Sequence, residues 1–211
     1  MSTPGLSRPV TAGPAPALED ELPPYVGIAM NAVRLVCTEG DAADALAALM
    51  AADAIGFDTE SKPTFAKGEV STGPHLVQLA LDDVVWLFQT ATPAGTALAI
   101  PVMKPVLESD AILKAGFGLG DDVRRLRAKF GIEAKNVLDL STALRRRGER
   151  NPLGAKSAVA RFLGQRLQKS KRITTTNWSL PRLSEQQLKY AADDAHAALR
   201  IYRHWRANPP A

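Results

Sequence analysis

Three short acidic clusters, each inside a hydrophobic stretch, constrain this chain more than any other feature. The acids come in pairs: Asp58 and Glu60 in AIGFDTES, Asp121 and Asp122 in KAGFGLGDDVRRL, and Asp193 and Asp194 in LKYAADDAHAAL. Burying an uncompensated carboxylate costs several kcal/mol, a large part of the net stability of a domain. Three such exceptions predict that the carboxylates gather around positive charge, and metal ions are the obvious candidate.

Length and composition favour one folded domain preceded by an arm. The chain has 211 residues and 45% hydrophobic content, enough for a full core in a single domain. Residues 1–24 hold six prolines and no aromatic residue. We therefore expect a disordered arm over residues 1–24 and a folded domain over residues 25–211.

The sequence argues against membrane insertion, secretion and cysteine chemistry. No run approaches the roughly 18 apolar residues of a membrane helix, and the proline-broken N-terminus lacks the apolar core of a secretory signal. The single cysteine, Cys37, excludes an internal disulfide and a zinc site built from cysteines. We expect a cytoplasmic protein, and the Ala- and Arg-rich composition indicates a GC-rich bacterial genome.

Positive charge is concentrated in one segment. Residues 141–172 carry ten Lys or Arg residues and one acid, a net +9, so the rest of the +4 chain carries −5. A basic segment on an acidic body predicts an anionic polymer, nucleic acid, as the partner. The alternative is a solvated helix face with scattered arginines.

Strand-like and helix-like patterns alternate, which indicates an α/β fold with a mixed β-sheet flanked by helices. The expected strands are residues 34–38, 54–59, 75–81, 84–88, 111–116 and 137–140, with the third and fourth joined as a hairpin around Asp82 and Asp83. The expected helices are residues 41–52 capped by Asp41, 103–108 with Pro101 and Pro105 in its first turn, 122–130, 141–147, 156–163, and 184–205 with the capping box Ser184-x-x-Gln187.

Periodicity selects among the paired acids. Asp58 and Glu60 lie two apart at a strand end, so both side chains point to one face of the sheet. On the last helix, Asp194 shares an otherwise apolar stripe with Tyr190, whereas Asp193 shares a polar stripe with Lys189. Asp194 is therefore predicted to face inward and Asp193 to be a surface charge. Tyr190 also fits an ordinary core aromatic.

The middle acidic pair follows a glycine-rich passage. Asp121 is suited to the N-cap of the next helix, which would put Asp122 in its first turn, on the inward side with Leu126. The alternative is that both acids only stabilise the N-terminus of the helix through its dipole.

Together the three clusters resemble the DEDD superfamily of 3′–5′ exonucleases, in its tyrosine-bearing branch. Asp58 and Glu60 match the first motif, Lys114 with the glycine lead to Asp122 matches the second, and Tyr190 with Asp194 matches the third. The segment NWSLPRLSEQQLKYAADDA is similar to the Werner syndrome exonuclease domain and the RNase D nuclease domain. The histidine-bearing branch is disfavoured because Lys189 occupies the position of its histidine. The resemblance implies an RNase H-like (DnaQ-like) exonuclease fold.

The resemblance also implies a chemistry and a substrate. Asp58, Glu60, Asp122 and Asp194 would hold two divalent cations, Mg²⁺ or Mn²⁺, and Tyr190 would orient the attacking water and the scissile phosphate. The expected reaction is release of nucleoside 5′-monophosphates from the 3′ end of DNA, single-stranded or 3′-recessed, in a role such as DNA repair. A separate helicase partner would supply unwinding, since the chain has no Walker motif.

Further residues are expected to contact nucleic acid or to be structural. Five side chains are candidates for contacts with the strand: Lys169, Lys171, Arg172, Arg124 and Trp178. Trp178 would stack on a base or, equally, pack its loop against the core. The histidines His75, His196 and His204 show no ligand spacing and are predicted at the surface or an edge. The loop over residues 61–74 is expected to border the active site.

Two other functions fit the same residues. One is an RNase D-like 3′–5′ exoribonuclease, which differs in whether 2′-hydroxyls help or hinder binding. The other is a catalytically inactive module that keeps the fold and binds nucleic acid. The presence of all four acids and the tyrosine argues against the inactive module.

Overall fold

The computed structural model describes residues 21–64, 68–69, 71–146, 148–168 and 171–209. Its strands are β1 (Val33–Leu35), β2 (Ala54–Glu60), β3 (Leu76–Ala80), β4 (Val85–Gln89), β5 (Leu113–Gly116) and β6 (Val137–Asp139). Its helices are α1 (Glu39–Met50), α2 (Pro93–Leu107), α3 (Gly120–Phe130), α4 (Leu140–Ala143), α5 (Ala155–Leu163), α6 (Lys171–Thr174) and α7 (Glu185–Ala207).

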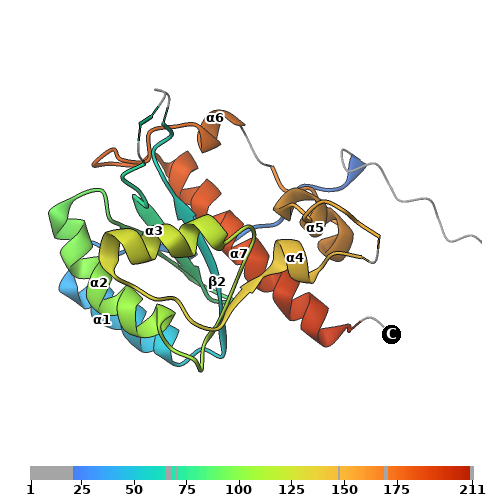
Figure 1. The fold of residues 1–211 in the computed structure, drawn as a ribbon, viewed down its shortest axis with the longest axis horizontal. Coiled ribbons are helices and arrows are strands. Elements are labelled where there is room, and N and C mark those ends of the chain that lie inside the picture. The colour runs from blue at the N-terminus through green and yellow to red at the C-terminus, as the bar shows by residue number, and fades with distance from the viewer. Residues whose placement is uncertain (1–20, 65–67, 70, 147, 169–170, 210–211) are drawn as a thin grey trace, which may run out of the picture.

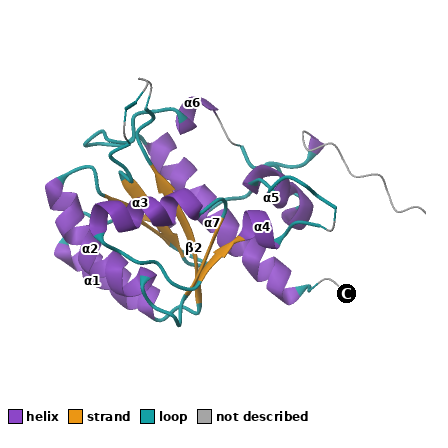
Figure 2. Cartoon of the chain, in the orientation of Figure 1, coloured by secondary structure: helices purple, strands orange, loops and turns teal. Residues whose placement is uncertain are grey.

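The six strands form one mixed sheet in the order β1-β4-β3-β2-β5-β6 (Figure 2). β3 pairs antiparallel with both β2 and β4, and the other neighbouring pairs are parallel. The predicted hairpin of the third and fourth strands is therefore confirmed, as is the mixed sheet flanked by helices. β2 is central, which places its acidic end in the middle of the sheet.

The two faces of the sheet carry different helices. One face of β2, with Ile55 and Phe57, packs in a core cluster with residues of α1, α2 and α3. The opposite face is covered by α7, which contacts β2, β3, β4 and β5 (Figure 1). The alternation of side chains along β2 thus directs Asp58 and Glu60 toward α7.

A close backbone contact fixes α7 on β2. A Cβ added at Gly56 would lie 2.0 Å from the Ala195 carbonyl oxygen, so only glycine permits this approach. The helix begins with the predicted capping box, in which the Ser184 side chain accepts from Gln187 N and the Gln187 side chain accepts from Ser184 N. Small residues on its buried face let the helix axis lie close to the sheet.

The helix predicted over residues 103–108 is the last part of a longer helix, α2, whose start was predicted wrongly. The helix begins at Pro93, after Thr92 caps its N-terminus, and it contains both Pro101 and Pro105 in its interior. Proline in a helix interior removes a backbone hydrogen bond and ordinarily breaks the helix. Here the buried side chains on α2, including Val102 and Met103, pack in the core beneath it. Tertiary packing therefore outweighs the cost of the two prolines.

Two predicted helix caps also differ in detail. Thr38 is the N-cap of α1, and Asp41 completes its capping box from the third helical position. α3 begins earlier than predicted, with Leu119 as its N-cap residue, so Asp121 lies in the first turn. The Asp139 carboxylate accepts from the backbone of Gly118 and Leu119 and so supports the turn into α3.

The end of the predicted arm is attached to the fold. Residues 1–20 lie outside the described part, but Arg166 N donates to Pro23 O and Tyr25 N donates to Arg166 O. This pairing places Pro23 and Pro24 against the segment that follows α5. No helix within the described ranges has the length and apolar character needed to cross a membrane.

Candidate active site

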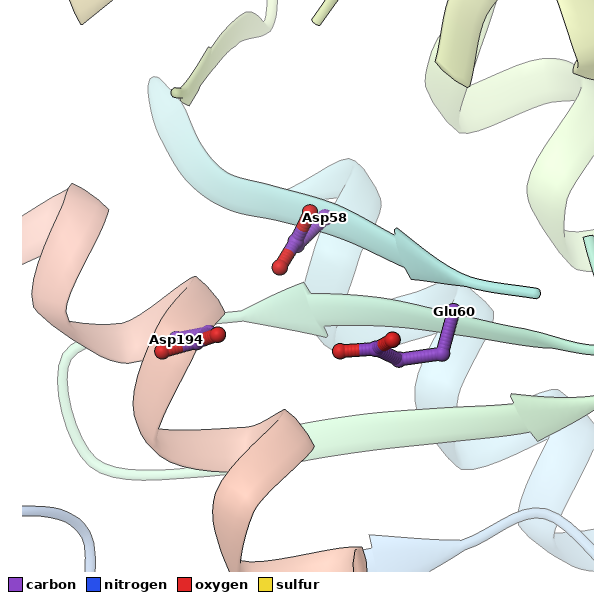
Figure 3. Close-up of side chains that lie close together, drawn as sticks. All are labelled: Asp58, Glu60 and Asp194. Carbon is purple, nitrogen blue, oxygen red and sulfur yellow. The ribbon is translucent and has the colours of Figure 1, made fainter. Parts of the chain in front are cut away.

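Three of the predicted acids converge between β2 and α7. One carboxylate oxygen from each of Asp58, Glu60 and Asp194 lies within 4.8 Å of the others. Figure 3 shows Asp58 and Glu60 extending from β2 and Asp194 from α7 into the same space. Asp194 thus faces inward from α7, as predicted.

The chemistry of this cluster suits a hard cation. Glu60 and Asp194 are buried, at 9% and 7% exposure, and burial raises the cost of their negative charges. Carboxylates held this close repel one another unless a cation lies among them. Oxygen donors are the ligands preferred by Mg²⁺ and Mn²⁺. The three side chains therefore fit one divalent cation.

Asp122 approaches β2 from the other face. It is buried at the start of α3, and its Oδ1 accepts a hydrogen bond from Thr59 Oγ1. Thr59 lies between Asp58 and Glu60 and points away from them. Burial raises the pKa of the Asp122 carboxyl, while the Thr59 hydrogen bond and the charge of Arg125 oppose that rise. The structure thus brings three of the four predicted acids into one cluster and leaves Asp122 on the other face of β2, bonded to Thr59.

Tyr190 lies one helical turn before Asp194 and is almost fully buried, at 9% exposure. Its hydroxyl shares a hydrogen bond with Thr174 Oγ1 of α6 at 3.1 Å. The ring lies 6.2 Å, centroid to centroid, from Trp178. The ring of Tyr190 therefore packs against Trp178, while its hydroxyl bonds to α6.

Asp193 makes different contacts from Asp194. It forms an ion pair with Lys189, as their predicted shared stripe implies, and its Oδ1 accepts from Ile28 N at 3.1 Å. The second contact was not foreseen, and it attaches the segment before β1 to α7. Asp193 is therefore half-buried and structural, not a plain surface charge.

A pocket opens beside the acidic cluster. It has a volume of about 570 Å³, and its walls include Tyr25, Met30, Ile173, Tyr190 and Asp194. Its sides come from the segment before β1, from the region of α6, and from the first turns of α7. The lining also includes the charged side chains of Glu185, Lys189 and Asp193. Apolar and aromatic walls with a few polar groups are typical of ligand pockets.

Arg125 and His75 were missed as site residues by the sequence reasoning. The Arg125 guanidinium lies 3.5 Å from Ser61 Oγ, next to the end of β2, and its charge acts on Asp122. Its spacing of three from Asp122 on a helix was a usable signal. His75 was predicted at the surface or an edge, but its side chain is buried, at 3% exposure.

His75 holds both ends of the loop that follows β2. Its Nδ1 accepts from Lys62 N at 3.0 Å, its Nε2 lies 3.1 Å from Thr72 Oγ1, and its backbone N donates to Glu60 O. Burial, with the charges of Lys129 and Lys62, lowers the pKa of His75 to about 4. His196 is also buried, since its ring bonds Tyr25 Oη and the Asp82 carbonyl. His204 is exposed, as predicted.

The predicted nucleic-acid contacts have mixed outcomes. Of the two alternatives for Trp178, the structure has core packing: the side chain is 0% exposed beside Tyr190, so its ring presents no face for stacking on a base, and the stacking prediction is corrected. Arg124 is exposed and paired with Asp121. Arg172 is exposed on α6. Lys169 and the side chain of Lys171 lie outside the described residues.

Comparison with known proteins identifies the group to which this geometry belongs. The profile of a protein family described as 3′–5′ exonuclease matches residues 33–207. The chain belongs to this 3′–5′ exonuclease family. The match covers every strand and helix named above, including β2 and α7, and it confirms the resemblance drawn from the three acidic motifs.

Individual members of the 3′–5′ exonuclease family are similar over most of this chain. A 3′–5′ exonuclease of Arabidopsis thaliana is 30% identical over 71% of the chain and 51% of its own length. The mouse bifunctional 3′–5′ exonuclease and ATP-dependent helicase is 30% identical over 72% of the chain and 11% of its own length. The chain thus spans about half of the first relative and a small part of the second.

Solved structures share the fold. The EXO domain of Aedes aegypti Nibbler has a TM-score of 0.69 at 26% identity, covering 84% of this chain and 88% of that one. RNase D of Trypanosoma brucei has a TM-score of 0.74 at 25% identity, covering 84% of this chain and 65% of that one. Both support the RNase H-like exonuclease architecture predicted from the sequence.

Proposed function

We propose that this chain is a 3′–5′ exonuclease that shortens DNA, single-stranded or 3′-recessed, and releases nucleoside 5′-monophosphates with the help of two divalent cations, Mg²⁺ or Mn²⁺. The observation that carries the proposal is the convergence of Asp58, Glu60 and Asp194 within 4.8 Å beside Tyr190. Membership of the 3′–5′ exonuclease family gives the direction of degradation.

Each residue of the site has a part in this reaction. Asp58, Glu60, Asp122 and Asp194 would together hold the two cations. Bound cations of this kind lower the pKa of a water and neutralise charge that develops on the leaving oxygen. The Tyr190 hydroxyl, at the pocket wall, would orient the attacking water and the scissile phosphate.

The pocket supports a binding position for the end of the strand. Its walls at Tyr25, Met30 and Ile173 offer apolar surface for a sugar and base, and Asp194 and Tyr190 belong to the same lining. Arg125, beside Asp122, and the exposed Arg172 would contact phosphates. Contacts to phosphate position a strand without reading its sequence, so we expect little base preference.

An RNase D-like exoribonuclease is the second candidate. The specific observation in its favour is the similarity to Trypanosoma brucei RNase D, whose structure in complex with RNA U12 has a TM-score of 0.73 at 25% identity with this chain. DNA and RNA differ at the 2′-hydroxyl, which a pocket either bonds or excludes. Relative rates on matched substrates distinguish the two.

The experiment is degradation of matched 5′-labelled substrates: single-stranded DNA, 3′-recessed duplex DNA and RNA of the same sequence, each with Mn²⁺, Mg²⁺ or EDTA. The proposal expects a ladder that shortens from the 3′ end, appears only with a divalent cation, and forms fastest on DNA. Thin-layer separation of the products should give nucleoside 5′-monophosphates.

Two results would contradict the proposal in different ways. Faster shortening of RNA would assign the site to the exoribonuclease. Undiminished binding in EDTA with no mononucleotides under any condition would favour the inactive binding module and leave the acids with structural roles. A helicase partner would be needed only if blunt duplex resists degradation while the 3′-recessed substrate is shortened.

A further inference from the structure

Gln78 is the most anomalous buried polar residue near the acidic cluster. Its side chain is 0% exposed, and neither its amide nitrogen nor its amide oxygen has a hydrogen-bond partner among the residues that the structure describes. Buried polar groups in native proteins are nearly always paired, because an unmade hydrogen bond costs free energy. A glutamine kept in such a place calls for a reason other than packing.

The position of Gln78 in the sheet points to that reason. Gln78 of β3 is the direct antiparallel partner of Asp58 of β2. Paired residues on neighbouring antiparallel strands direct their side chains to the same face, with Cβ atoms about 5 Å apart. Gln78 therefore lies next to Asp58, on the face that α7 covers and on which Asp58, Glu60 and Asp194 meet.

The rest of this face of β3 is apolar. Leu76 and Ala80 flank Gln78 on its own strand, Leu87 is its partner on β4, and all three are fully buried under α7. A leucine or methionine at position 78 would fit these neighbours without an unmade hydrogen bond. Stability alone therefore does not explain the amide.

We propose that Gln78 is a positioning residue for the acidic cluster: its amide donates a hydrogen bond to the Asp58 carboxylate once a divalent cation draws Asp58, Glu60 and Asp194 together. This inference rests on the function proposed above. A neutral amide suits the role, because it holds a carboxylate oxygen without competing with the cation as a positive charge would. Partners of this kind fix the direction of a ligand, and their loss typically weakens metal binding about 10–100-fold.

The test separates the positioning role from a packing role by measuring cation binding directly. Mn²⁺ binding to wild type, Gln78→Met and Gln78→Leu is measured by isothermal titration calorimetry, which gives the half-saturating concentration, and the Tm of each protein is measured without and with the cation. Leu87→Met is the matched control, since it places a methionine beside Gln78 on the same face and keeps the amide of Gln78.

The expected result has two parts. Without cation, both Gln78 variants melt at or above the wild-type temperature, because a buried unpaired amide has been removed. With cation, their half-saturating Mn²⁺ concentration rises about 10-fold or more. Leu87→Met keeps the wild-type half-saturation. In nuclease assays at saturating nucleic acid, activity of the Gln78 variants is restored in part by raising the Mn²⁺ concentration.

Two results would overturn the inference while leaving the proposed function intact: unchanged Mn²⁺ half-saturation in the Gln78 variants, or a fall in their cation-free Tm, which would give the amide a structural partner. A wild-type protein whose Tm does not respond to Mn²⁺ or Mg²⁺ would overturn both the inference and the cation-dependent function. The wild-type response to cation distinguishes these cases. The Leu87→Met control shows that a new methionine on this face does not by itself change cation binding.

Discussion

Asp193 and Asp194 are adjacent in the chain, yet their carboxylates point in different directions from α7 and have different partners. Asp194 lies within 4.8 Å of the Asp58 and Glu60 carboxylates, whereas Asp193 pairs with Lys189 and accepts from Ile28 N. A helix turns about 100° per residue, so two neighbouring acids cannot face the same point. This relationship makes the pair an internal comparison for the function of the cluster.

Asp194→Asn should lower the rate of degradation by at least about 100-fold, because it removes one negative charge and one ligand from the cluster. Asp193→Asn should keep most of the activity. Its amide oxygen still accepts from Ile28 N, and the lost ion pair with Lys189 is partly exposed and worth at most about 1 kcal/mol. Initial rates and urea unfolding of both variants test this, and equal loss of activity in the two would refute the helix-face assignment.

Tyr190→Phe should reduce the rate about 10²-fold or more, in the range attributed to a group that assists proton transfer or orients the nucleophile. The ring still packs against Trp178, so the fold and the Mn²⁺-dependent rise in Tm should be unchanged. Tyr202→Phe is the control, since it makes the same change on a buried tyrosine of α7 in the core cluster away from the acids. Full activity of Tyr190→Phe would remove the hydroxyl from the reaction.

Much of the site was predictable because it follows from local periodicity. The period of two along β2 puts Asp58 and Glu60 on one face, and the helical period of α7 separates Asp194 from Asp193. These relations hold for any strand or helix with these residues. The order of the sheet followed in part from the hairpin of β3 and β4, whose turn is short and polar.

The remainder depended on contacts between distant segments, which no local pattern contains. The two prolines of α2 remained in a helix only because its side chains pack over the sheet. The sequence left open whether Trp178 stacks on a base or packs against the core, and it placed His75 at the surface or an edge. The contacts that bury the two side chains come from α7 and from β2. The position of the unpaired Gln78 amide next to Asp58 depends on the register of β3 against β2, which the sequence does not give.

Stability should increase with pH between about 8 and 10 because of Lys114. This ammonium is fully buried on β5 and donates to the carbonyls of Ser109 and Ile112, and burial lowers its pKa to about 8. Between the folded pKa near 8 and the unfolded value near 10.5, the unfolded chain binds the proton that the folded chain has lost, so the free energy of unfolding rises with pH.

Lys114→Met isolates this contribution. The difference in unfolding free energy, wild type minus variant, should rise by about 2 kcal/mol from pH 7.5 to 9.5, as measured by urea unfolding at each pH. The range ends before Tyr25 opposes the trend, since burial raises the pKa of that phenol to about 12 and makes the folded state lose stability above pH 10. A constant difference would mean that the Lys114 ammonium keeps its proton throughout this range.

Gly56→Ala should separate β2 from α7 and so disrupt the cluster without changing any acid. The new methyl group would lie 2.0 Å from the Ala195 carbonyl oxygen, and a backbone atom cannot rotate away as a side chain does. Overpacking of this kind costs about 1–3 kcal/mol. Because Asp194 precedes Ala195, the displaced helix should also carry its carboxylate away from Asp58 and Glu60. We therefore expect a lower Tm together with a weaker Mn²⁺-dependent increase in Tm and a lower degradation rate.

Gly120→Ala is the matched control for Gly56→Ala. Gly120 begins α3, and a Cβ at that position would meet no atom within 4 Å. Alanine there favours the helix, so the variant should be as stable as wild type or more stable, with unchanged activity. A Gly56→Ala protein that matches Gly120→Ala in Tm, cation response and rate would show that α7 can move away from β2 without loss of the site, and would contradict the role given to this backbone contact.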